Sequence, residues 1–96
     1  MAKGERIYPY SPMLLYNLAN DIVEILKGEL KHDTNEWLEF VVKMYQKKTL
    51  YQFYFLVQND GCLLSIETPG EGKTAEQRVS FMFSLVDTLL AQIEND

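Results

Sequence analysis

The feature that most constrains this chain is a change to two-residue periodicity at residue 50. From there to residue 58 the side chains fall into two alternating sets, which predicts a β-strand because successive side chains of a strand point to opposite faces. One set is entirely apolar: Tyr51, Phe53, Phe55 and Val57. Asn59-Asp60-Gly61 follows and favours a tight turn, and residues 62–68 alternate again. The sequence therefore predicts an antiparallel β-hairpin over 50–58 and 62–68.

Residues 11–30 have the spacing of a helix. Ser11 is a good N-cap, Pro12 suits the first helical position, and Gly28 can end the helix in a left-handed conformation. Apolar residues cover well over half of the circumference, whereas a surface helix usually has a stripe of about 100°. This helix is therefore expected to be covered on more than one side.

Residues 34–48 predict a second helix. Asp33 and Glu36, three positions apart, resemble a capping box at its start. Its apolar surface is again wide. Three lysines lie near its end, and we expect them to interact favourably with the partial negative charge of the helix C-terminus: Lys43, Lys47 and Lys48.

The last predicted helix covers residues 74–94 and has the clearest helical periodicity in the chain. Phe81 and Leu85 lie off its main apolar stripe and form a second, smaller patch. Residues 1–10 have no periodicity, and we expect an extended segment that lies across the body of the protein. The predicted fold is α+β, in the order α-α-β-β-α, with three helices packed against one hairpin in a single domain over 1–96.

Charge and composition exclude several classes of function. The chain has 96 residues and a net charge of −5, with two bases and seven acids in residues 49–96. This balance argues against nucleic-acid binding, which depends on Lys and Arg. No apolar stretch approaches the roughly 20 residues of a membrane span or resembles a signal sequence. Cys62 is the only cysteine and cannot form an internal disulfide, so we expect a cytoplasmic protein.

One motif has the look of a phosphate-binding loop, Glu67-Thr-Pro-Gly-Glu-Gly-Lys-Thr74. Its first position requires Gly, and Glu67 would repel phosphate there. His32 is the only histidine and, with Cys62, is too little for a metal site. We therefore expect no catalytic residue, no cofactor, no metal and no nucleotide chemistry.

The apolar excess on several predicted elements indicates a surface covered by another protein. The expected function is a small non-enzymatic protein–protein interaction module, an adaptor, inhibitor or regulator that forms a homodimer and binds a further, basic protein. The expected partner and dimer surface consists of Tyr8, Tyr10, Asp60, Glu67, Glu71, Glu76, Phe81 and Leu85.

Two alternatives remain open. The first is a small-molecule-binding or weakly enzymatic domain, with a pocket between hairpin and helices lined by Trp37, Tyr51 and Tyr54. The second is a nucleic-acid accessory protein, since the strand aromatics could stack on bases.

Overall fold

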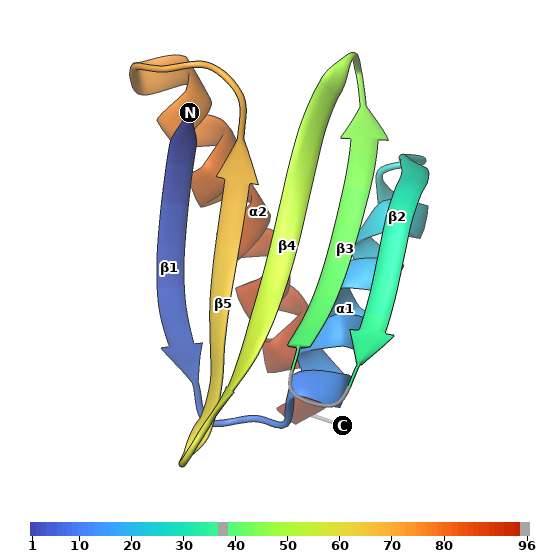
Figure 1. Ribbon diagram of the computed structural model, residues 1–96, viewed down its shortest axis with the longest axis vertical. Helices are drawn as coiled ribbons and strands as arrows, with labels where there is room; N and C mark the ends of the chain where they lie inside the picture. Colours follow the sequence, from blue (N-terminus) through green and yellow to red (C-terminus); the bar gives the residue numbers. More distant parts are fainter. Residues whose placement is uncertain (37–38, 95–96) are drawn as a thin grey trace.

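A five-stranded antiparallel sheet with two helices makes up the described part of the protein (Figure 1). The computed structural model describes the backbone of residues 1–36 and 39–94 and the side chains of residues 1–30 and 40–94. Its elements are β1 (Ala2–Tyr8), α1 (Pro12–Ile25), β2 (Glu29–Glu36), β3 (Glu39–Gln46), β4 (Thr49–Gln58), β5 (Gly61–Thr68) and α2 (Lys73–Glu94). The strand order is β1-β5-β4-β3-β2, and every neighbouring pair is antiparallel.

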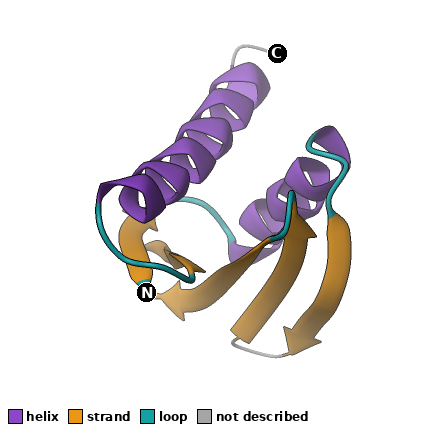
Figure 2. Cartoon of the chain, turned by 90° about the horizontal axis from the view of Figure 1, so that it is seen from above, coloured by secondary structure: helices purple, strands orange, loops and turns teal. Residues whose placement is uncertain are grey.

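Both helices lie on the same face of the sheet, and the opposite face carries neither of them (Figure 2). α1 packs on β3 and β4, and α2 packs on β1 and β5. An antiparallel sheet permits this arrangement, because such a sheet commonly packs one face on the core and leaves the other in contact with solvent.

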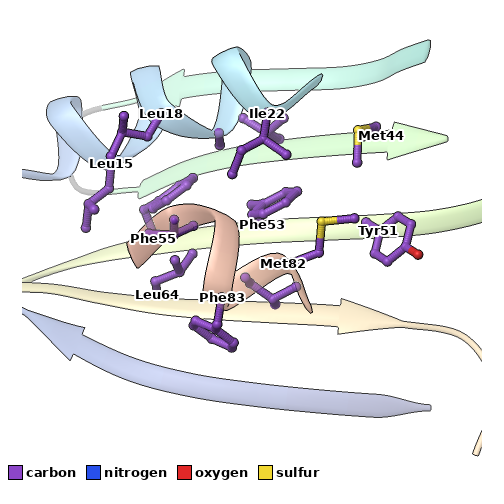
Figure 3. Packing of buried hydrophobic residues seen from close by; sticks show 14 of the residues in the cluster. Leu15, Leu18, Ile22, Met44, Tyr51, Phe53, Phe55, Leu64, Met82 and Phe83 are labelled. Atoms are coloured by element: carbon purple, nitrogen blue, oxygen red, sulfur yellow. The ribbon is translucent and has the colours of Figure 1, made fainter. Parts of the chain in front are cut away.

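The core fills the space between the helices and the covered face of the sheet (Figure 3). Phe53 and Phe55 lie at its centre and are at most 1% exposed. Leu15 and Ile22 pack on them from α1, and Met82 reaches the same cluster from α2. The alternation that predicts β4 therefore places its entirely apolar set toward the helices.

The predicted order α-α-β-β-α is wrong, because the described chain has two helices and a five-stranded sheet in place of three helices and a hairpin. Of the range predicted as a helix, residues 34–36 belong to β2, residues 39–46 to β3 and residues 47–48 to the turn that follows. Along β3, Phe40, Val42 and Met44 are buried against the helices, and the residues between them face the other side. Because Val41 and Tyr45 on the other side are apolar as well, the sequence shows no clear two-residue alternation here. Its apolar residues instead resemble the wide apolar surface of a buried helix.

Residues 1–10, expected as an extended segment across the body, contain a strand of the sheet. β1 pairs with β5 from Ala2 opposite Thr68 to Tyr8 opposite Cys62. The β4–β5 hairpin is therefore the interior of a larger sheet. The ranges of β4, β5 and α2 each agree with the sequence periodicity to within one residue.

α1 begins as predicted, with Ser11 as its N-cap and Pro12 as its first residue. It ends at residue 25, earlier than the expected residue 30, because Lys27 adopts a left-handed φ of 54°. The amide of Gly28 then donates to the carbonyl of Val23 at 2.8 Å, which is the long bond of a Schellman motif. The helix thus ends at a lysine in a conformation that usually selects glycine.

The assignment of Lys43, Lys47 and Lys48 to a helix C-terminus is also wrong. Lys43 lies within β3, and the other two form the turn between β3 and β4, with φ of 50° and 63°. Positive φ at both central residues matches the right-handed twist of the paired strands. Lysine reaches this conformation at a cost in free energy that glycine does not have.

We predict that Lys48→Gly stabilises the protein by about 1 kcal/mol, since it removes the contact of Cβ with the backbone in the left-handed conformation. The free energy of unfolding from urea titration measures the change. Lys43→Gly removes the same charge from within β3 and is expected to lower stability. An equal response of the two variants would contradict the turn conformation.

Candidate functional site

Three hollows lie along the outer edge of β1 and the adjoining side of α2, and we call them together the β1–α2 groove. They have volumes of about 420, 220 and 270 Å³ and follow one another along the strand. The first lies beside Ala2 and Glu76, the second beside Gly4 and Phe83, and the third beside Tyr10. Together they contact every residue of β1 except Ile7, and β1 lies at the margin of the sheet (Figure 1).

The middle hollow lies along the edge of the strand. It is lined by five consecutive residues of β1, from Ala2 to Arg6, and by one side of α2. Since successive side chains of a strand point to opposite faces, a hollow that contacts all five lies beside the backbone. Within the described chain, β1 has a strand partner on one side only. Its other side therefore presents backbone N–H and C=O groups to the groove.

Gly4 sets how closely β1 approaches α2. A Cβ at this position would lie 2.8 Å from Cε2 of Phe83 and 2.9 Å from Cγ1 of Val79. Both distances are shorter than carbon atoms tolerate, so any larger residue would push strand and helix apart. The floor of the groove depends on this contact.

Asp87 of α2 joins the helix to β1. Its Oδ2 accepts a hydrogen bond from the guanidinium of Arg6 at 2.7 Å, and its Oδ1 accepts one from the hydroxyl of Tyr8 at 2.9 Å. The Arg6 guanidinium also lies 4.5 Å from the centre of the Phe83 ring, within the range of a cation–π interaction. A charged acceptor strengthens both hydrogen bonds, and together they hold β1 in place on α2.

Burial, and then the hydrogen bond to Asp87 and its charge, raises the pKa of Tyr8 to about 12. The hydroxyl therefore stays protonated and donates to Asp87 across the physiological pH range. This fits a structural role for the Arg6–Asp87–Tyr8 cluster, since a proton this tightly held is not transferred near neutral pH.

The groove is acidic on balance. Among the described residues, three positive groups line the three hollows: Lys3, Arg6 and the terminal ammonium of Met1. Arg6 is paired with Asp87, and the Met1 ammonium lies 3.9 Å from Oε1 of Glu71. The Nζ of Lys3 lies 3.4 Å from Oε1 of Glu5 and 3.8 Å from Oε1 of Glu67. Five acids of the described chain line the same hollows: Glu5, Glu71, Glu76, Asp87 and Glu94.

Four of the eight residues expected at a partner surface line this groove. Tyr8 and Tyr10 border the hollow at one end, and Glu71 and Glu76 border the hollow at the other. Tyr8 is itself largely buried, with its hydroxyl turned to α2. The sequence analysis predicted that these four residues share one surface, but it did not predict that β1 and α2 lie side by side.

The other four expected residues are dispersed. Asp60 is exposed in the β4–β5 turn, and Glu67 lies on the uncovered face of the sheet beside Lys3. Phe81 is 51% exposed on α2, but Leu85 packs against the core. The structure therefore does not form the joint exposed patch expected from Phe81 and Leu85.

The residues expected to line a small-molecule pocket do not converge. Tyr51 is buried under the helices, and Tyr54, three positions along the same strand, belongs to the opposite face. Trp37 and the side chain of His32 lie outside the described residues. Cys62 is fully buried, and burial raises the pKa of its thiol to about 11, which makes it an unreactive core residue.

Sequence reasoning missed Gly4, Arg6 and Asp87. Only the pairing of β1 with β5 brings Arg6 to Asp87, which is 81 positions away in the sequence. The available signal was the alternation Ala2, Gly4, Arg6, Tyr8, in which every second residue faces the helices. Two of these residues are small, one is charged and one is aromatic, so they do not form the uniformly apolar set by which a half-buried strand is recognised.

The described residues contain no group of three or more His, Cys, Asp and Glu side chains placed to hold a metal ion. Neither α1 nor α2 is long and apolar enough to cross a membrane. No protein-family model matches the chain, and a search of curated proteins finds none of significant similarity.

We predict that Gly4→Ala lowers the free energy of unfolding by about 1–3 kcal/mol, because the added methyl group overpacks the contact with Phe83. Thermal unfolding followed by circular dichroism measures the loss. In a Phe83→Leu background the same substitution should cost less, since the smaller side chain makes room. Equal losses in both backgrounds would contradict the close approach of β1 to α2.

The Tyr8–Asp87 bond predicts a specific pH dependence. The pKa of Tyr8 rises from 10.0 to about 12 on folding, so its stabilisation is complete below pH 10 and is lost as the pH rises through about 12. Tyr8→Phe should be less stable than the wild type at pH 8, and the difference should shrink by pH 11. Urea-unfolding midpoints at both pH values measure it, and a constant difference would contradict the assignment.

Proposed function

We propose that the protein is a protein-interaction module that binds an extended segment of a partner protein along the open edge of β1. The observation that carries the proposal is the hollow that follows five consecutive residues of β1 beside α2. An extended chain placed there would become a sixth strand of the sheet, next to β1.

Strand addition makes use of both walls of the groove. The backbone of β1 supplies hydrogen-bond donors and acceptors, which give affinity without requiring a particular sequence. The wall formed by α2 contacts alternate side chains of the added strand through Val79, Ser80 and Phe83. The Arg6–Asp87 ion pair holds strand and helix at a fixed separation, so little ordering is needed on binding.

The acidic lining favours a basic segment. Glu71 and Glu76 border one end of the groove, and Glu94 borders the other. All three are exposed, so they act chiefly on the rate of association through long-range attraction. The proposed ligand is therefore an extended peptide rich in Lys and Arg.

Selection of random twelve-residue peptides on the full chain tests the proposal. Peptides rich in Lys and Arg should be enriched, and binding should weaken steeply from 50 to 500 mM salt, because salt screens exposed charges. Hydrogen exchange of the β1 amides should slow in the complex, since strand addition bonds those that face the groove.

Matched variants identify the surface. Glu76→Lys, inside the groove, should weaken binding by about three- to ten-fold, whereas Glu24→Lys, an equal charge change on α1, should have little effect. Ser80→Phe should obstruct the groove, and Gln92→Phe, at an exposed position of α2 that lines none of the three hollows, should not. Peptides whose affinity is unchanged by Ser80→Phe would refute the proposed site.

A further inference from the structure

The uncovered face of the sheet is a second surface with a different chemistry. The strand register places Leu63 of β5 between Ile7 of β1 and Leu56 of β4. The next row across the sheet contains Glu5, Ser65, Tyr54 and Val41. A shallow hollow of about 330 Å³ contacts residues of three strands here, Tyr54 and Leu63 among them, so these side chains share one face.

This face is more apolar than a solvent-facing sheet requires. An antiparallel sheet with one solvated face usually alternates apolar residues inward with polar residues outward. Here the outward set of β4 includes Leu50, Tyr54 and Leu56, and Ile7 is 69% exposed on β1. Large exposed apolar areas mark surfaces that another protein covers.

The described charges on this face are balanced, and three of them lie in one row across the sheet. Gln52 of β4 pairs with Lys43 of β3 on one side and with Glu67 of β5 on the other. Over β1, β5, β4 and β3, the described side chains bring two lysines and two glutamates to this face, Lys3, Lys43, Glu5 and Glu67. The β1–α2 groove is acidic by contrast, so the two surfaces favour different partners.

We infer that the uncovered face docks a second copy of this chain, face to face, about a two-fold axis that lies parallel to β4. Such an axis places β4 of one copy over β4 of the other and exchanges the strands on either side. Tyr54 then faces Tyr54 of the second copy, and Lys43 faces Glu67. Because the symmetry repeats each contact, the pair Lys43–Glu67 forms twice.

The area suffices for such a dimer. With strands about 4.8 Å apart and a rise of about 3.3 Å per residue, five strands of eight residues span roughly 600 Å². Stable protein interfaces bury roughly 600–1,000 Å² on each partner, so this face reaches the lower end of that range. Face-to-face packing of two sheets, about 10 Å apart, is a common arrangement of antiparallel sheets.

Charge reversal tests the register of the dimer. Light scattering of the full chain at about 10 μM should give a mass near twice 11.2 kDa. Lys43→Glu and Glu67→Lys should each weaken self-association at least ten-fold, because like charges then face each other twice. A mixture of the two single variants should form a heterodimer, since opposite charges at positions 43 and 67 then face each other in both symmetry-related contacts.

Further variants separate this face from the groove. Tyr54→Lys should abolish the dimer with an unchanged circular dichroism spectrum, whereas Lys48→Glu, in the β3–β4 turn, should leave it intact. A monomer up to about 100 μM would overturn the inference. A dimer that resists Tyr54→Lys but is lost in Ser80→Phe would overturn it as well, because it would form through the groove.

Discussion

The pairing of β1 with β5 is the contact on which the rest of this structure depends. It joins residues 2–8 to residues 62–68 and makes the β4–β5 hairpin the interior of a sheet. It also carries Arg6 and Tyr8 to Asp87, so that the first strand and the last helix share one carboxylate. A two-stranded hairpin is marginally stable alone, and the added strands give the two helices a wide surface to cover.

The edge position of β1 and the placement of both helices on one face create the two candidate interaction surfaces. As an edge strand, β1 leaves one row of backbone groups unpaired within the described chain, and the packing of α2 beside that edge makes a groove of it. The two helices meanwhile cover only one face of the sheet (Figure 2). The acidic groove suits a basic extended chain, and the balanced, apolar face suits an identical copy.

Local signals predicted those elements whose pattern has one physical interpretation. Ser11 and Pro12 define the start of α1 through a capping bond and a fixed φ, and β4 follows from its entirely apolar face. The second predicted helix was wrong because residues 39–46 are apolar on both faces. Phe40, Val42 and Met44 lie in the core, whereas Val41 and Tyr45 belong to the uncovered face.

The amino-acid sequence by itself determined the N-cap of α1, the hairpin, the acidic second half and the expectation of a surface that another protein covers. These depend on neighbours within a few residues, or on composition. Only the tertiary structure decided which strand pairs with β1, which face the helices cover and where the acids gather. Arg6, Gly4 and Asp87 have no local signature, because their roles arise from contacts between residues about 80 positions apart. Such contacts form when burial of the whole core outweighs the entropy of closing the long loop between them.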